Sequence, residues 1–200
     1  MGIFSTPIAK INLERELSFD ETNFIINQRK KPRTEDRLVI QSENTKILED
    51  IILNDLKIFF EQSLNHFFQE LFNPTTNVSL RITQSWANYS TIGQAHHEHF
   101  HANSVISGVF YVDTNENSDK IFFCRDTPII PYQIHTEKVN MWSADEWWLS
   151  AEKGTLLLFP SNLKHKVDAV VEEKERISIS FNSFFSGEIG DVRNLTQLIV

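Results

Sequence analysis

The chain has 200 residues, of which 40% are hydrophobic and 23% charged, and its formal net charge is −8. This length and composition predict one globular domain and exclude a disordered or membrane-spanning chain. The acidic excess argues against general nucleic-acid binding, which needs a basic surface. The single cysteine, Cys124, excludes an internal disulfide and a cysteine-rich metal site, and fits a cytoplasmic protein.

The N-terminal part of the chain, residues 1–76, is predicted to be an extension built around one long helix. Up to residue 44 the sequence is mostly polar and predicts irregular structure. From Thr45 to Phe72 apolar residues recur at steps of three and four, which is the pattern of one buried helix face. The helix should end at Asn73, because a residue that precedes proline avoids the helical conformation.

From residue 77 to the C-terminus the sequence changes to short β-rich runs separated by turn residues. Several short strands with no helices between them are typical of an antiparallel sandwich or barrel rather than of a parallel α/β sheet. We therefore predict a mainly β (α+β) protein with one domain, residues 1–200, in which the helical part packs on a sandwich formed by residues 77–200. The runs are VSLRITQSW, SVISGVFYV, KIFFC, TLLLFP and RISISFN.

A cluster of histidines opens the first motif, which contains His96, His97, His99 and His101. Alternate residues of a strand share a face, so the three odd-numbered histidines should lie on one side and His96 on the other. Two histidines two positions apart can converge on one metal ion, whereas the outer two of the three would be about 13 Å apart. The spacing leaves the pair open, 97 with 99 or 99 with 101, and makes the distant His165 the natural third ligand.

A second motif lies at residues 176–182, where polar and apolar residues alternate without a break. The alternation places Arg176, Ser178, Ser180 and Asn182 on one face of a strand. If that face lines a polar pocket, the guanidinium can bind a carboxylate through two hydrogen bonds, and a serine hydroxyl can add a third.

Between these motifs, residues 126–152 hold three tryptophans, Trp142, Trp147 and Trp148. A long aromatic loop near a site is typical of a lid or a substrate-binding wall. The same side chains could instead fill the core between the strands and the N-terminal helix, and the sequence does not choose between these roles.

In this order the motifs resemble a family of 2-oxoglutarate/Fe(II)-dependent oxygenases of marine bacteria and T4-like phages. The Ser-Gly pair stands eight residues after His99 (107 − 99), as in that family, which selects His99 and His101 as the ligand pair. The resemblance covers most of residues 77–183. It rests on Trp86-x-Asn88, Gly93, His99-Phe-His101, Ser107-Gly108-Val-Phe-Tyr111, Gly154 to Pro160, His165 and Arg176 to Asn182.

The resemblance implies a double-stranded β-helix, or jelly roll, in which His99, His101 and His165 hold Fe(II). It also implies that 2-oxoglutarate chelates the iron, and that an unactivated C–H bond of a small-molecule or peptidyl substrate is hydroxylated with O2, releasing succinate and CO2. The cytoplasm would be that of the host if the gene is phage-encoded, and a homodimer is left open. The residues implied to contact the cosubstrate are Arg176, which would pair with its far carboxylate, and Ser178, Asn88, Tyr111 and Asn182.

One ligand departs from the usual superfamily pattern, in which His-x-Asp/Glu is followed by a distant histidine. Here His101 stands where the carboxylate would be, so that three neutral ligands leave the iron with its full positive charge. Glu98 is expected on the opposite face of the strand and therefore cannot replace the carboxylate. The alternatives are a cupin-like three-histidine metalloprotein that does not use 2-oxoglutarate and a catalytically inactive module that binds a partner.

Overall fold

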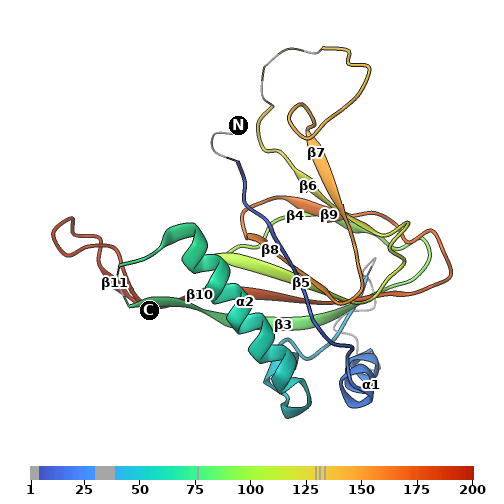
Figure 1. Cartoon of the computed structure of the whole chain (residues 1–200), viewed down its shortest axis with the longest axis horizontal. Helices are drawn as coiled ribbons and strands as arrows, with labels where there is room; N and C mark the ends of the chain where they lie inside the picture. The colour runs from blue at the N-terminus through green and yellow to red at the C-terminus, as the bar shows by residue number, and fades with distance from the viewer. Residues whose placement is uncertain (1–4, 30–38, 76, 129, 131, 133) are drawn as a thin grey trace.

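The computed structural model describes residues 5–29, 39–75, 77–128, 130, 132 and 134–200 (Figure 1). Within these residues no helix is both long and apolar enough to cross a membrane. The elements are β1 (Ala9–Asn12), α1 (Phe19–Gln28), β2 (Ile40–Gln41), the 3-10 turns η1 (Ile47–Glu49) and η2 (Ile51–Leu53), α2 (Asn54–Phe72), β3 (Val78–Ser90), β4 (His96–His99), β5 (Ile106–Asp113), β6 (Lys120–Cys124), β7 (Glu146–Ser150), β8 (Thr155–Pro160), β9 (His165–Val167), β10 (Arg176–Ile189) and β11 (Leu198–Ile199).

Two antiparallel sheets lie face to face, and α2 covers the outer side of the larger one (Figure 1). The larger sheet has the order β1-β8-β5-β10-β3-β2, with β11 paired to β10, and the smaller sheet has the order β4-β9-β6-β7. The N-terminal part of the chain therefore supplies both edge strands of the larger sheet. This arrangement confirms the predicted mainly β sandwich.

The helices differ from the prediction in two respects. Helix α1 lies where the sequence predicts irregular structure, and a capping box fixes its start. The Ser18 hydroxyl accepts from the Glu21 N–H, and the Glu21 carboxylate accepts from the Ser18 N–H. Helix α2 begins at Asn54 rather than Thr45, because η1 and η2 precede it. It ends as predicted before Asn73, which adopts a left-handed φ of 38°.

The strands of the larger sheet separate two apolar cores. On the side that faces α2, the rings of Phe110 in β5 and Phe181 in β10 each lie 5.3 Å from the ring of Phe60. Between the two sheets a second core includes Tyr111 and Phe159. Since alternate residues of a strand face opposite sides, the polar residues of β10 point away from α2 and into the space between the sheets.

The hairpin of β6 and β7 projects beyond the two-layer body (Figure 1). Trp142, Trp147 and Trp148, on this hairpin, are 57%, 38% and 42% exposed. The tryptophans therefore do not fill the core between the sheet and the N-terminal helix. Their role as a lid or substrate-binding wall stays a prediction.

Candidate metal centre

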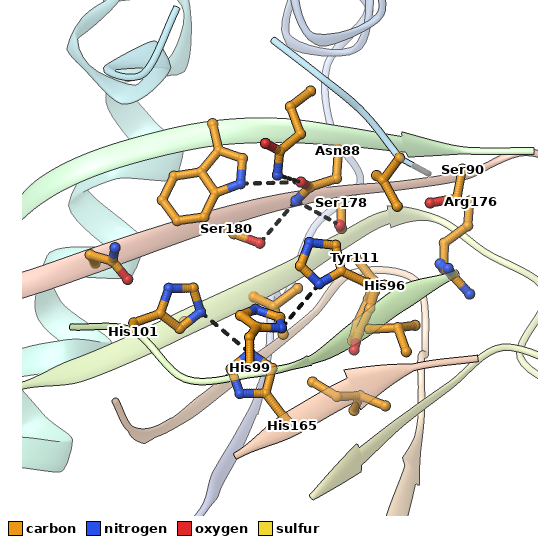
Figure 2. Close-up of a pocket in the computed structure, with 18 of the residues that line it drawn as sticks. Asn88, Ser90, His96, His99, His101, Tyr111, His165, Arg176, Ser178 and Ser180 are labelled. Atoms are coloured by element: carbon orange, nitrogen blue, oxygen red, sulfur yellow. Dashed lines mark hydrogen bonds between the residues drawn. The ribbon is translucent and has the colours of Figure 1, made fainter. Parts of the chain in front are cut away.

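A cavity of about 660 Å³ lies between the two sheets (Figure 2). Among the described residues that line it, Arg176 is the only one with a permanent charge. Histidines gather at one end and Arg176 lies at the other, so the cavity joins two chemically different sites. The histidines that line it are His96, His97, His99, His101 and His165.

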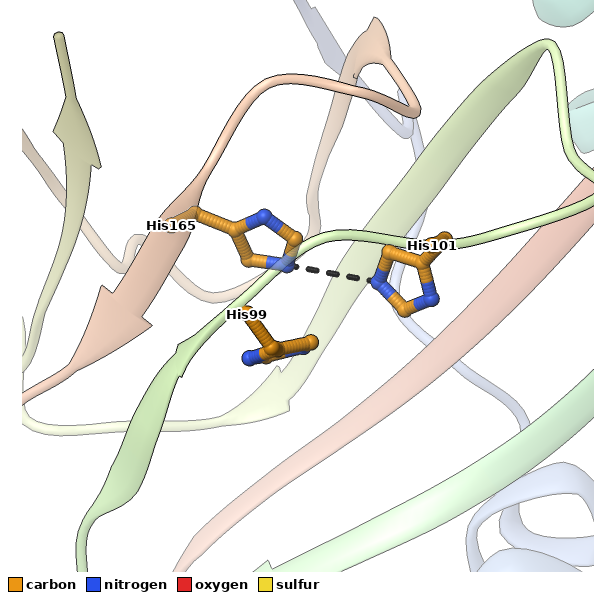
Figure 3. A group of neighbouring side chains, drawn as sticks. All are labelled: His99, His101 and His165. Atoms are coloured by element: carbon orange, nitrogen blue, oxygen red, sulfur yellow. Dashed lines mark hydrogen bonds between the residues drawn. The ribbon is translucent and has the colours of Figure 1, made fainter. Parts of the chain in front are cut away.

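Three of these histidines meet at one point, although His165 begins β9, His99 ends β4 and His101 lies just after β4 (Figure 3). One ring nitrogen of each lies within 4.8 Å of the others. The Nε2 atoms of His101 and His165 are 3.3 Å apart. Two nitrogens that bind one ion at a right angle, each at about 2.1 Å, would be about 3.0 Å apart. The spacing therefore fits a shared metal ion.

Backbone carbonyls orient two of the rings. Nδ1 of His165 lies 2.9 Å from the Leu163 carbonyl oxygen, and Nδ1 of His99 lies 2.7 Å from the His97 carbonyl oxygen. Because a carbonyl oxygen only accepts, both Nδ1 atoms carry the proton, and the Nε2 lone pairs are left for a cation.

Burial keeps the three rings neutral. It is the main cause that lowers the pKa of His101 to about 3 and that of His165 to about 4, and it also lowers the pKa of His99. Neutral imidazole is the form that binds a metal. A set of three imidazoles suits iron as well as zinc, nickel and copper.

The histidine strand departs from the predicted alternation. β4 ends at His99, and His101 follows in an irregular segment where its N–H donates to the Ser161 carbonyl oxygen at 2.9 Å. The register of β4 against β9 shifts between His96 and His99, and the Nδ1 atoms of these two residues are 3.1 Å apart. The prediction that His96 points away from the other histidines is therefore wrong. The cause is a bulge, which alternation cannot reveal.

At the opposite end, Arg176 is buried and already paired. Its Nη1 donates to Oδ1 of Asp119 at 3.0 Å and to the Asp168 carbonyl oxygen at 3.2 Å. Within the described parts of the chain, Nη2 and Nε make no hydrogen bond and remain available to a ligand. No sequence motif surrounds Asp119, which lies in the turn between β5 and β6, so its pairing with Arg176 has no signal in the sequence.

The Tyr111 hydroxyl is buried and has no hydrogen-bond partner among the described residues. Burial raises its pKa, so it is a neutral donor, and the nearby Arg176 counteracts part of this shift. An unsatisfied buried hydroxyl costs about 1–3 kcal/mol. A ligand oxygen bound at this end of the cavity would recover that cost.

Asn88 organises the polar wall between the two ends. Its Oδ1 accepts from the Trp86 indole N–H at 3.1 Å, and its Nδ2 donates to Oγ of Ser180 at 3.0 Å and to Oγ of Ser178 at 3.4 Å (Figure 2). Because both amide atoms are engaged, Asn88 holds the serines in place. All the residues predicted for the cosubstrate line the cavity, namely Arg176, Ser178, Asn88, Tyr111 and Asn182.

The family comparison bears on the middle of the chain. Residues 84–182 match the model of a family described as "Putative 2OG-Fe(II) oxygenase". This span contains the three histidines and every residue predicted for the cosubstrate. No curated protein shows significant similarity to the sequence.

Solved structures share the fold at low identity. An oxidoreductase of the 2OG-Fe(II) oxygenase family from Burkholderia pseudomallei has a TM-score of 0.55 at 12% identity, covering 87% of this chain and 83% of that one. HygX from Streptomyces hygroscopicus, with nickel, 2-oxoglutarate and hygromycin B bound, has a TM-score of 0.58 at 11% identity. The match covers 89% of this chain and 82% of HygX. A prolyl hydroxylase from Trichoplax adhaerens, in complex with a peptide fragment, has a TM-score of 0.59 at 12% identity. The match covers 88% of this chain and 83% of the hydroxylase. These likenesses confirm the predicted double-stranded β-helix.

Proposed function

We propose that this chain is a 2OG-Fe(II) oxygenase that hydroxylates an unactivated C–H bond of its substrate, a proposal supported by the family match over residues 84–182 and by the fold. His99, His101 and His165 would hold Fe(II), and Arg176 would bind the far carboxylate of 2-oxoglutarate. The proposal is supported by one cavity that joins a cluster of neutral histidines to a buried arginine. A ligand that chelates a metal at one end and carries a carboxylate at the other matches both ends.

With iron and 2-oxoglutarate bound, O2 would be the oxidant: one of its oxygen atoms would enter the substrate as the new hydroxyl group, and the other would enter succinate as 2-oxoglutarate loses CO2. The residues of this chain bind and orient. The carbonyl of Leu163 fixes the ring of His165, so that Nε2 faces the metal position. Nη2 and Nε of Arg176 and the Tyr111 hydroxyl would donate to the far carboxylate, and Asn88 holds Ser178 beside it.

Apolar side chains form the wall next to the histidines. The Phe159 ring centroid lies 4.8 Å from that of His165, and Val109 and Ile121 are further apolar residues that line the cavity. An apolar wall excludes water, which strengthens electrostatic interactions and limits side reactions in the site.

The proposal extends to the class of substrate, the cellular location and the oligomeric state. Solved structures of this fold include one with hygromycin B and one with a peptide fragment, so a small-molecule or peptidyl substrate is compatible with the fold. We place the enzyme in the cytoplasm, where one cysteine stays reduced. An origin in marine bacteria or T4-like phages rests on the sequence resemblance, and a homodimer is open to measurement.

Anaerobic titration with Fe(II) and then 2-oxoglutarate tests the function. We expect the weak visible charge-transfer band of the chelate near an equimolar ratio, and succinate after air is admitted. Arg176→Ala should weaken 2-oxoglutarate binding and leave iron binding intact. A protein that binds iron without 2-oxoglutarate would support the cupin-like alternative, and a protein that binds neither would support the inactive module.

A further inference from the structure

We propose that Asp119 is a positioning residue that holds Arg176 in place and offsets the charge of its guanidinium. In this role Asp119 sets how strongly the cavity prefers a cosubstrate that has a second carboxylate, far from the metal. The inference rests on the proposed function. Asp119 does not line the cavity, so it does not contact a ligand there and acts through its hydrogen bond to the guanidinium and through its charge.

The pair is buried and held from several sides. The side chains of Arg176 and Asp119 are 5% and 2% exposed. Oδ2 of Asp119 accepts from the Asn115 N–H at 2.8 Å, and the Asp119 carbonyl oxygen accepts from the Ala151 N–H at 3.0 Å. The carboxylate therefore stays beside Nη1, with the two free donor atoms of the guanidinium available to a ligand.

The charges of the whole cavity explain why this pairing matters. Fe(II) brings two positive charges, and the three imidazoles add none. Arg176 is the only permanently charged residue among the described lining, and Asp119 cancels its charge. The cavity then offers two positive charges to the two negative charges of 2-oxoglutarate. Because His101 stands where the metal-binding carboxylate usually lies, the ligand set lacks one negative charge. The carboxylate of Asp119, paired with Arg176, contributes that charge instead.

The total charge is balanced, but the positive charge is distributed unevenly between the two ends of the cavity. The metal end keeps its full charge and binds the keto-acid head strongly. The far carboxylate meets an ion pair with no net charge, and Asp119 repels it across a buried, weakly screened distance. The cavity should therefore discriminate only modestly between 2-oxo acids with and without a second carboxylate.

Removing the Asp119 charge reverses this balance. The isosteric substitution Asp119→Asn would leave Arg176 as a buried cation without an anionic partner, and such a group binds a carboxylate tightly. We expect the affinity for 2-oxoglutarate, relative to an acid that has only the keto-acid head, to rise about tenfold. The affinity for the head-only acid should change less than about threefold.

The experiment is calorimetric titration of Zn(II)-loaded protein, because imidazole also binds zinc and the zinc form does not turn over. The probes are 2-oxoglutarate and 2-oxopentanoate, which share the keto-acid head and chain length and differ in the far carboxylate. The measured quantity is the ratio of the two affinities in wild type and Asp119→Asn. A structural role alone would weaken both ligands together and leave this ratio unchanged.

Glu21→Gln is the matched control. Glu21 is a buried carboxylate that also accepts from an arginine, Arg15 at 2.6 Å, and from a backbone N–H, that of Ser18 at 2.7 Å. It belongs to α1 and does not line the cavity. We expect Glu21→Gln to lower the thermal midpoint without changing the affinity ratio.

The outcomes separate this inference from the proposed function. If both ligands bind and the ratio in Asp119→Asn is unchanged or lower, the inference is overturned and the oxygenase proposal stands. If neither ligand binds the metal-loaded wild type, both fail. Should the variant not fold, the wild-type ratio decides: a preference for 2-oxoglutarate above about tenfold would overturn the inference, and a smaller preference would support it.

Discussion

The Nε2 atoms of His101 and His165 lie 3.3 Å apart, although 64 positions separate the two residues in the chain. Strand β9 brings them together, because it pairs with β4 and places His165 opposite His99. Nε2 of His165 carries a lone pair, because its Nδ1 donates to the Leu163 carbonyl oxygen, and this lone pair can accept from a protonated His101 Nε2 or bind a cation held between the two rings. A metal ion should therefore stabilise the fold as well as complete the site.

Replacing His165 tests the ligand set. His165→Gln should lower the affinity for Fe(II) or Zn(II) at least 100-fold, because it removes one of three ligands, and loss even of a supporting hydrogen bond costs about 10–100-fold. Calorimetric metal titration measures the effect. His66→Gln, at an exposed position of α2, is the control and should bind metal like wild type. Unchanged affinity in His165→Gln would show that the ligands are other residues.

Moving the carboxylate between the two ends of the cavity tests the charge balance. His101→Asp adds a negative charge at the metal while Asp119 remains, so 2-oxoglutarate should bind about tenfold more weakly. The double variant His101→Asp with Asp119→Asn restores the total charge and should recover most of the affinity. Anaerobic titration of the Fe(II) forms gives the dissociation constants. A double variant that binds as weakly as His101→Asp would contradict the charge argument.

The metal-free protein should lose stability as the pH falls from about 6.5. The pKa values of His101 and His165 are lowered to about 3 and about 4 in the folded state, whereas the unfolded chain has a pKa near 6.5. The unfolded state therefore binds more protons in this window, and the free energy of unfolding decreases with falling pH. We expect the thermal midpoint of the metal-free protein to drop by more than about 5 °C between pH 7 and pH 5.

Zn(II) should reduce this drop, because bound metal keeps the rings unprotonated. His101→Gln should reduce it as well, since the variant has one titrating ring fewer. Equal midpoints for the metal-free wild type at pH 7 and pH 5 would show that the histidines are not buried in the neutral form.

Trp86 should report metal binding through its fluorescence. Its ring centroid lies 6.0 Å from that of His101, whereas Trp142 lies on the projecting hairpin. Ni(II) quenches nearby indoles, so titration with Ni(II) should lower the emission to saturation at one equivalent. Trp86→Phe should remove most of this quenching and Trp142→Phe should keep it. Equal quenching in both variants would place the ion away from the three histidines.

Much of the site could be predicted because its signals are local. The alternation in residues 176–182 indicated which side chains of β10 face the cavity, and the spacing of the clustered histidines indicated a metal site while leaving the ligand pair open. The position of His96 depends on a bulge set by pairing with β9, and the pairing of Asp119 with Arg176 joins a turn to a strand far along the chain. Such features arise only in the folded protein. The capping box of Ser18 and Glu21, in contrast, is a local signal that the sequence itself carries for the start of α1.

The strands at the two ends of the cavity differ in length and in the number of strands that pair with them. β4 has four residues and forms an edge of the smaller sheet, whereas β10 has fourteen and is hydrogen-bonded on both sides by β3 and β5. The histidine end of the cavity therefore depends on a short edge strand and on the irregular segment that follows it, whereas Arg176 lies on a strand fixed from both sides. A substitution near His99 should disturb the sheets less than one near Arg176.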